Sequence, residues 1–194
     1  MNIGFDVFSM PLAALLAVLL DRLFGEVKRW HPLVGFGNLA GAIEKKLNQR
    51  NLLAGVVAWL LAVAPWVVLA FWLRPYAPFV VDVVLLYFAL GAQSLCEHAE
   101  AIAQPLQAGR LDEARQRVGW IVSRETSALD ESGVAKAGVE SVLENGNDAI
   151  FGALFWFALL GGPGALFFRL ANTLDAMWGY RTKRFNLFGR PAAR

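Results

Sequence analysis

Three acidic side chains recur at intervals of four residues in the C-terminal half of the chain. Glu140, Glu144 and Asp148 are spaced i, i+4 and i+8, so they share one face of a helix if that helix continues through all three positions. Like charges at this spacing repel each other, and no lysine interrupts the stripe. A Mg²⁺ site would explain the arrangement, because hard cations take carboxylate oxygens and often bridge phosphates. A solvated acidic face is the alternative.

Further polar residues follow this stripe. Asn172 and Asp175 precede a cluster of basic residues that contains Arg181, Lys183 and Arg184. A carboxylate and an amide beside cations suit an anionic, phosphate-bearing ligand. A basic flank that only fixes membrane topology explains Lys183 and Arg184 equally well.

His31 is the earliest candidate for chemistry. It precedes Pro32, and a proline disfavours the helical conformation of the residue before it. The imidazole could serve as a general acid or base or contact a phosphate. From the local sequence alone, a histidine in a turn at the membrane interface is the simpler interpretation.

The composition indicates which kind of protein must position these residues. Of the 194 residues, 57% are hydrophobic and 18% are charged, whereas soluble proteins have about 45–50% and about 25%. The apolar residues form long blocks, which is typical of a polytopic membrane protein. The net charge of +2 is too small to indicate a nucleic-acid partner, and because no basic stripe is interleaved with aromatic residues, nucleic-acid binding is not expected.

The predicted fold is all-α. Residues 1–96 are predicted to form three transmembrane helices, at 7–20, 51–73 and 79–96, with a polar loop between the first two that carries the His-Pro pair. Asp82, near the start of the third helix, is expected at the membrane interface. The lipid bilayer is thus an expected partner.

Residues 97–148 are predicted to form a polar helical region. Two amphipathic helices are expected, separated near residues 107–110. A third helix should begin at Asp130, whose side chain is a good N-cap, and continue to about Asn145.

Residues 149–194 contain an apolar segment interrupted by Gly161-Gly162-Pro163-Gly164. Each half is too short to span a bilayer. If the first polar loop is cytoplasmic, a full span would place the basic C-terminal tail on the non-cytoplasmic side. That placement would contradict the positive-inside rule. We therefore predict a re-entrant helical hairpin, with a single kinked span as the alternative. The predicted location is the inner membrane, multi-pass, with the polar loops facing the cytoplasm.

The motifs of this C-terminal half resemble those of a known family. Residues 123–126, SRET, followed by LD at 129–130, are similar to its G-R-D-T…L-D, and residues 140–148, ESVLENGND, match its E-S-x-x-E-N-x-x-D. The segments FW at 155–156, GGPGA at 161–165 and NTLDAMWGY at 172–180 match three further motifs, and His31-Pro32 stands where its early H-P motif stands. The chain thus resembles the adenosylcobinamide-phosphate synthase family (CobD/CbiB) of cobalamin biosynthesis along essentially its whole length.

Some positions depart from the family pattern. Glu125 stands where aspartate is usual, and Gly25-Glu26-Val27 replaces an early G-D-P. Family members also continue beyond the position of Arg194, through an acidic segment and further membrane helices. The resemblance therefore implies that this chain lacks the C-terminal part of the family.

The resemblance implies an amide-forming ligase. Its substrates would be aminopropanol or its O-phosphate, a propionate carboxylate of the corrinoid adenosylcobyric acid, and ATP with Mg²⁺. Glu140, Glu144 and Asp148 would hold Mg²⁺ or polarise the amine. The implied phosphate-binding and substrate-orienting residues are Arg124, Glu125, Asn145, Asn172, Asp175, Arg181, Lys183 and Arg184. His31 would transfer protons, and corrinoid-pathway enzymes or a second copy of the chain are possible partners. An AmpE-like signalling or scaffold protein without catalysis is the alternative function.

Overall fold

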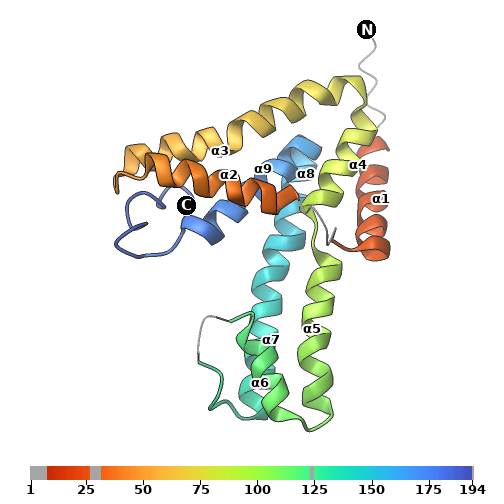
Figure 1. Ribbon diagram of the computed structural model, residues 1–194. Helices are drawn as coiled ribbons and strands as arrows, with labels where there is room; N and C mark the ends of the chain where they lie inside the picture. The colour runs from red at the N-terminus through yellow and green to blue at the C-terminus, as the bar shows by residue number, and fades with distance from the viewer. Residues whose placement is uncertain (1–7, 27–31, 123–124, 194) are drawn as a thin grey trace.

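A computed structural model describes residues 8–26, 32–122 and 125–193, and every regular element in these ranges is helical. The predicted all-α class is confirmed for this part of the chain (Figure 1). The helices are α1 (Ser9–Phe24), α2 (Pro32–Leu47), α3 (Leu52–Leu73), α4 (Pro78–Ala89), α5 (Ala92–Gln107), α6 (Leu111–Gly119), α7 (Glu131–Gly146), α8 (Gly152–Leu160) and α9 (Gly162–Trp178). A 3₁₀ turn (Arg74–Tyr76) precedes α4, and a π-helical segment (Asn147–Phe151) joins α7 to α8.

Helices α5, α6 and α7 form an arm at the lower end of the molecule (Figure 1). Their shared core contains Ile102, Val118 and Val134. The predicted break between two amphipathic helices is confirmed, because the chain turns between α5 and α6 at Gly109, whose φ is +70°. The predicted cap of α7 is confirmed as well, since the Asp130 carboxylate accepts a hydrogen bond from the backbone N–H of Gly133 at 2.7 Å.

The predicted hairpin around residues 161–164 is also present. Gly161 adopts φ +70°, which favours glycine because it has no Cβ. Helix α8 ends there and α9 packs back against it, so closely that a Cβ on Gly164 would collide with the carbonyl oxygen of Trp156. A kinked single helix is therefore wrong, whereas the re-entrant path through a membrane stays a prediction.

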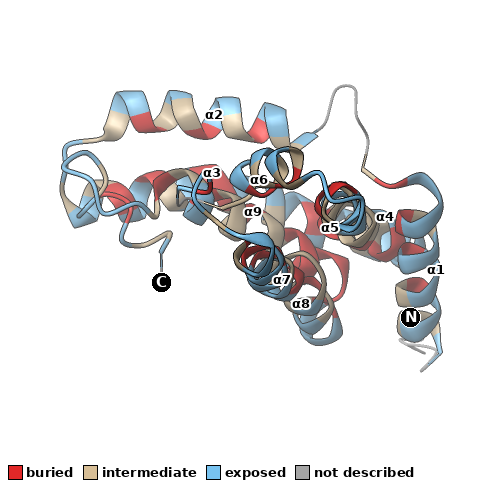
Figure 2. Ribbon diagram, turned by 90° about the horizontal axis from the view of Figure 1, so that it is seen from below, coloured by how far each residue is buried: buried red, intermediate tan, exposed pale blue. Residues whose placement is uncertain are grey.

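Two buried clusters divide the apolar half of the molecule. One joins α1, α4, α8 and the start of α9 around Leu86 and Phe157. The other joins α2, α3, the rest of α9 and the C-terminal segment around Trp178 and Phe188, whose rings lie 5.2 Å apart. Helix α2 covers this second cluster with one face, and its opposite side is exposed (Figure 2).

The third predicted span, 79–96, is interrupted in the structure. Helix α4 ends at Ala89, Leu90 is extended with ψ 157°, and α5 begins only at Ala92. The first predicted span corresponds to α1, which has 16 residues, fewer than the roughly 20 that cross a bilayer. Three spans therefore remain a prediction.

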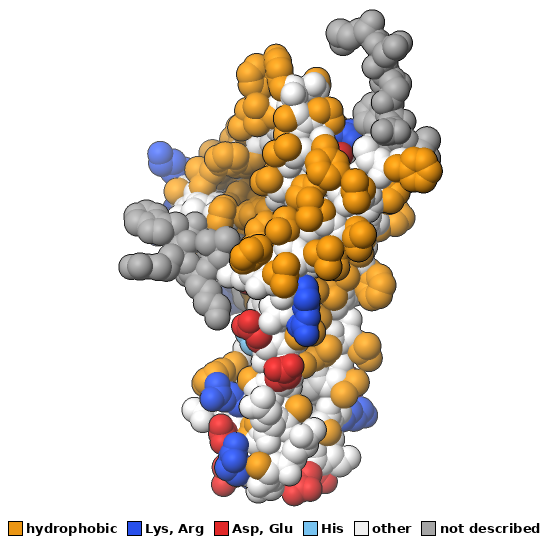
Figure 3. Space-filling model, turned by 90° about the vertical axis from the view of Figure 1, so that its right-hand side faces the viewer, with side chains coloured by type: hydrophobic (Ala, Val, Ile, Leu, Met, Phe, Trp, Pro, Cys, Tyr) orange, Lys and Arg blue, Asp and Glu red, His pale blue; other side chains and the backbone are white. Residues whose placement is uncertain are grey.

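Within the described part of the chain, two helical segments are long and apolar enough to cross a membrane, Leu52–Tyr76 and Pro78–Gln107. Figure 3 shows hydrophobic side chains over the upper part of one face and charged side chains gathered over the lower arm. This distribution is consistent with a membrane protein whose arm projects into water. The orientation of the polar segments stays a prediction.

Asp82 does not lie at an exposed interface as expected. Its carboxylate is buried and accepts hydrogen bonds from Nε and Nη2 of Arg74, both at 2.9 Å, and from the backbone N–H of Gly162 at 2.8 Å. The aspartate thus joins the turn before α4 to the turn of the α8–α9 hairpin. The interfacial interpretation failed because it considered α4 alone, without the hairpin that covers it.

Candidate functional site

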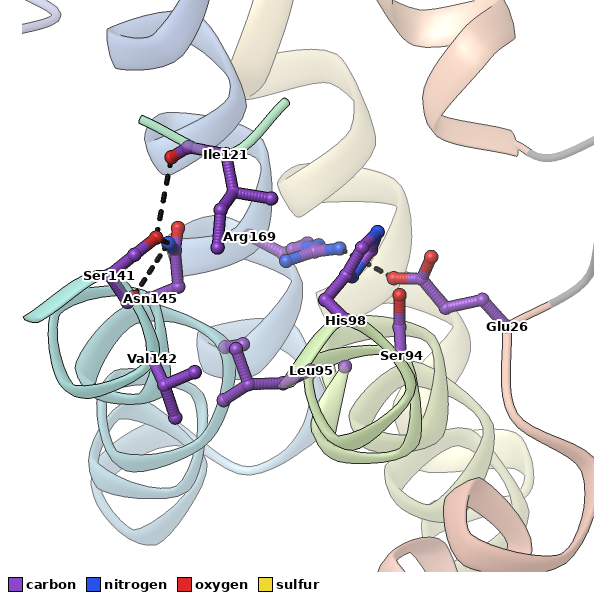
Figure 4. A pocket seen from close by; sticks show the side chains of 11 residues that line it. Glu26, Ser94, Leu95, His98, Ile121, Ser141, Val142, Asn145 and Arg169 are labelled. Atoms are coloured by element: carbon purple, nitrogen blue, oxygen red, sulfur yellow. Dashed lines mark hydrogen bonds and ion pairs between the residues drawn. The ribbon is translucent and has the colours of Figure 1, made fainter. Parts of the chain in front are cut away.

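A pocket of about 260 Å³ lies where the apolar half of the molecule meets the arm. Side chains from α5, α7 and α9 surround it, together with Glu26, which follows α1 by two residues (Figure 4). The lining residues are Glu26, Gly91, Ser94, Leu95, His98, Ile121, Ser141, Val142, Asn145, Ala149 and Arg169.

Two irregularities of the backbone form the inner side of this pocket. They are the break between α4 and α5 and the π-helical segment Asn147–Phe151, and the backbone N–H of Gly91 bonds to the carbonyl of Ala149 at 3.2 Å. A Cβ on Gly91 would lie 3.4 Å from Oε1 of Glu26, so glycine keeps this corner open. π-Helical turns are frequent at functional sites. Here the π-helical segment is hydrogen-bonded to the break between α4 and α5.

The start of α5 is held by a carboxylate from another helix. Asp21 of α1 is buried, and its Oδ2 accepts a hydrogen bond from the backbone N–H of Gln93 at 3.0 Å. Gly91, at the N-cap position of α5, has no side chain that could accept such a hydrogen bond. Asp21 therefore caps the start of α5 and positions Ser94, the next residue in the first turn, and His98, about one turn further on.

Arg169 is the cation of the pocket. Its Nη2 lies 3.1 Å from Oε1 of Glu26, and its side chain is 16% exposed. Burial disfavours its charge, and the carboxylates of Glu26, Asp148 and Asp21 favour it. Its Nε is buried and has no hydrogen-bond partner among the described residues.

Asn145 of α7 lies on the side of the pocket opposite Glu26 (Figure 4). Its amide nitrogen donates to the carbonyl of Ser141 at 2.8 Å and to the Ser141 hydroxyl at 3.1 Å. That hydroxyl donates in turn to the carbonyl of Ile121 at 3.3 Å. The chain of bonds fixes the amide plane, so its oxygen is positioned to accept a hydrogen bond from a ligand.

Asp148 and Asp175 form the acidic side of the region. The pKa of Asp175 is raised above its ordinary value, mainly because its carboxyl group is partly desolvated and also because the charge of Asp148 is near. The residue as a whole is exposed. Asn172 lies one helical turn after Arg169 and one turn before Asp175. Of the predicted residues, Asn145 lines the pocket with Arg169, Asp148 acts through its charge on both Arg169 and Asp175, and Asn172 lies one turn from Arg169 on α9.

Glu140 and Glu144 lie on exposed positions of α7. In the described ranges, no three His, Cys, Asp or Glu side chains gather in a way that could hold a metal ion. Glu140 and Glu144 lie in the regular helix α7, whereas Asp148 lies in the π-helical segment Asn147–Phe151 that follows it, so the three residues do not share one regular helix. The described residues do not fit a three-carboxylate Mg²⁺ site, and the assignment of magnesium to them stays a prediction.

The basic residues of the C-terminal segment lie elsewhere. Arg184 forms a two-pronged ion pair with the buried Glu44 of α2, with its Nε 2.9 Å from Oε1. This hydrogen bond lowers the pKa of Glu44. Arg181 and Lys183 are exposed, and neither they nor Arg184 line the pocket. Their binding of phosphate stays a prediction.

Of the three remaining predicted residues, Glu125 lies within the described ranges. Oε1 of Glu125 accepts hydrogen bonds from the backbone N–H groups of Ser127 and Thr126, at 3.1 and 3.0 Å, which lower its pKa and fold the start of the loop before α7. His31 and Arg124 lie outside the described residues.

Sequence reasoning overlooked Arg169, Glu26 and His98 as site residues. Arg169 was counted with the basic tail, although it is the only charged residue between positions 149 and 174, and a lone charge in an apolar segment is a functional candidate. His98 was expected on a helix surface, but it lines the pocket. Glu26 stands at the acidic position of the early G-D-P motif, but neighbouring residues could not reveal its partner Arg169, which is 143 positions away.

Comparisons with known proteins agree with the resemblance of the motifs. The family model described as "CobD/Cbib protein" matches residues 14–194. "Cobalamin biosynthesis protein CobD" of Chromobacterium violaceum is 54% identical over 190 residues, which are 92% of this chain and 61% of that protein. The protein of the same name from Stutzerimonas stutzeri is 55% identical over 96% of this chain and 63% of its own length. "Probable cobalamin biosynthesis protein CobD" of Pyrococcus furiosus is 35% identical over 95% of this chain.

The chain thus spans about three fifths of the length of the first two relatives. No solved structure matches it.

Proposed function

The chain belongs to the CobD/CbiB family, and from this premise we propose that it acts in cobalamin biosynthesis by ATP-dependent formation of an amide bond. The bond would join aminopropanol, or its O-phosphate, to a propionate carboxylate of adenosylcobyric acid. The observation that carries the proposal is the polar pocket around Arg169, which lies where the apolar helices meet the charged arm. Ser141 and Asn145 of the family-like motifs line it, and Asp148 acts on Arg169 through its charge.

The chemistry sets clear demands on the site. A carboxylate reacts poorly with an amine, because its oxygen is a poor leaving group. Transfer of the terminal phosphoryl group of ATP to that oxygen gives an acyl phosphate and ADP. The amine nitrogen then attacks the carbonyl carbon, phosphate departs with the oxygen, and one proton of the amine goes to a base. The site must therefore bind anions and also accept a proton.

Asp175 is suited to accept the proton. Its pKa is raised by desolvation and by the charge of Asp148, and a more basic carboxylate takes a proton from an ammonium group more readily. Asp148 would attract the same ammonium group, and Asn145 and Asn172 would orient the substrates by hydrogen bonds. ATP and Mg²⁺ are proposed from the family resemblance.

The volume of the pocket limits what can enter. Pockets that enclose drug-sized ligands measure about 300–1,000 Å³, so 260 Å³ admits a small molecule or the arm of a larger one. A corrin ring would remain outside, with only the propionate arm reaching inward. The apolar surface beside the pocket is consistent with a reaction at a membrane surface.

The first test is genetic. We would express this chain in cells that lack the synthase and supply adenosylcobyric acid as the corrinoid source, with the full-length Chromobacterium violaceum relative as the positive control. Growth with the chain would support the proposal. Growth with the relative alone would overturn the proposal for this chain.

The second test concerns the proposed base. In purified, active protein, we expect Asp175→Asn to lower the rate of amide formation by about 10²-fold or more, the effect typical of losing a general base. Asp112→Asn is the matched control, because Asp112 is 95% exposed on α6, away from the pocket, and pairs only with Arg115 in the described contacts. Equal rates for D175N and D112N would exclude Asp175 as the base.

A further inference from the structure

The arm is packed as a unit of its own. Its buried cluster around Ile102, Val118 and Val134 takes all its described members from α5, α6, α7 and the loop between α6 and α7. The two buried clusters of the apolar half contain no described residue of the arm. A unit with a separate core can move as one body, because its internal contacts are kept while it moves.

Two chain connections join the arm to the apolar half, and both are irregular (Figure 1). The first is the break between α4 and α5, where Leu90 is extended and Gly91 precedes the new helix. The second is the π-helical segment Asn147–Phe151 between α7 and α8. The hydrogen bond from the N–H of Gly91 to the carbonyl of Ala149 places the two irregular points side by side. A body attached at two points turns about the line through them, and hinges commonly lie at the ends of helices.

Helix α1 holds the first turn of α5 through polar contacts with Gln93. Oδ2 of Asp21 accepts a hydrogen bond from the backbone N–H of Gln93 at 3.0 Å, and the guanidinium of Arg22 donates to Oε1 of the same residue. We call these two contacts the latch. A few polar contacts open at a lower cost than a large apolar interface, so the latch restrains the arm without fixing it.

We propose that the arm pivots as a rigid body about the line through Gly91 and the π-helical segment, and that the latch sets how far it turns. The pocket lies beside this line, and its walls come from both bodies (Figure 4). Glu26 and Arg169 belong to the apolar half, whereas the lining side chains of α5 and α7 belong to the arm. Pivoting therefore changes the width of the pocket. This motion goes beyond the proposed function and does not depend on which molecule the pocket binds.

The test measures distances between spin labels on the whole chain in detergent, by pulsed electron paramagnetic resonance. The exposed Cys96 is first replaced by serine, so that labels attach only to cysteines introduced in pairs at exposed positions. One pair joins α2 to the arm, one lies within the apolar half, and one lies within the arm. These pairs are Lys46 with Gln116, Lys46 with Leu23, and Gln104 with Lys136.

We expect the pair that joins α2 to the arm to give a second distance, or a distribution clearly wider than those of the two internal pairs. A distribution as narrow as the internal ones would overturn the proposal. An equally wide distribution within the arm would also overturn it, because the arm would then not move as one body.

Two variants test the latch. Asp21→Ala removes the carboxylate that caps α5 and should raise the population of the minor distance about fivefold, the effect of one lost helix cap. Asp130→Ala is the matched control, because it removes a cap within the arm, on the N–H of Gly133, and should leave this distance unchanged. An unchanged distribution in D21A, or the same shift in D130A, would overturn the role of the latch. If D21A does not fold, as judged by circular dichroism, the distances in the chain with Asp21 decide whether the arm pivots.

Discussion

Asp82→Asn is expected to destabilise the apolar half of the molecule strongly. The Asp82 side chain is 5% exposed and that of Arg74 18%. The carboxylate accepts two hydrogen bonds from Arg74 and one from the backbone N–H of Gly162, and so connects α4 with the α8–α9 hairpin. Asparagine has nearly the same shape and keeps an acceptor for Gly162, but it removes the charge that balances Arg74.

The size of the effect follows from this geometry. Removing one partner of a buried ion pair costs about 3–5 kcal/mol. The Arg74 side chain is partly exposed to solvent, so we expect D82N to cost about 3 kcal/mol, at the lower end of this range. Asp82→Ala also leaves the Gly162 N–H unpaired, which adds about 1–3 kcal/mol. The alanine variant should therefore be less stable than the asparagine variant.

The assay is denaturant-induced unfolding in detergent micelles, followed by circular dichroism. The double variant Arg74→Met with Asp82→Asn should recover part of the loss, because it contains no uncompensated buried charge. Arg110→Gln breaks the exposed pair with Glu113 and should cost less than about 1 kcal/mol. A D82N protein as stable as R110Q would refute the reasoning that this ion pair clamps the hairpin.

Two further predictions concern the cluster that holds α2, α3 and the C-terminal segment. Glu44→Gln should cost about 1 kcal/mol at neutral pH, since Arg184 is 56% exposed. The lowered pKa of Glu44 means that its contribution is present above the ordinary value of 4.5 and is lost as the pH falls through the lowered value. Unfolding midpoints measured from pH 7 to pH 3 should thus converge for E44Q and the unchanged chain, and a constant difference would contradict this. Gly55→Ala should lower the thermal unfolding midpoint, because its Cβ would collide with the carbonyl of Phe188, whereas Gly41→Ala, which meets nothing within 4 Å, should not; equal midpoints would show that the C-terminal segment does not dock on α3.

Much of the helical framework could be predicted from local patterns. The Asp130 cap, the turn near Gly109 and the reversal at Gly161 each depend on a few neighbouring residues, and the structure has them. The interruption at Leu90 was missed, because residues 79–96 read as one apolar run. What stabilises the interruption is the contact of Gly91 with the π-helical segment, and hydropathy carries no information about such a partner.

The site could be predicted only in part. Asn145, Asp148, Asn172 and Asp175 were found because they stand within recognisable motifs. The Mg²⁺ face of Glu140, Glu144 and Asp148 assumed one regular helix, but α7 ends at Gly146 and Asp148 lies in the π-helical segment that follows.

The sequence by itself determined the family, the helical class, the apolar and charged segments and some helix ends, such as the Asp130 cap, whereas the predicted polar loop between the first two spans is wrong because it contains helix α2. These properties depend on residue type and on spacing within a few turns, which are written directly in the chain. Only the tertiary structure decided that Arg169 faces Glu26, that Asp82 binds Arg74 and Gly162, and that Arg184 is occupied by Glu44. A charged residue looks the same in the sequence whether its side chain is solvated or paired inside the protein. Its partner is set by how the helices pack, and these partners lie 80 to 143 positions away in the sequence.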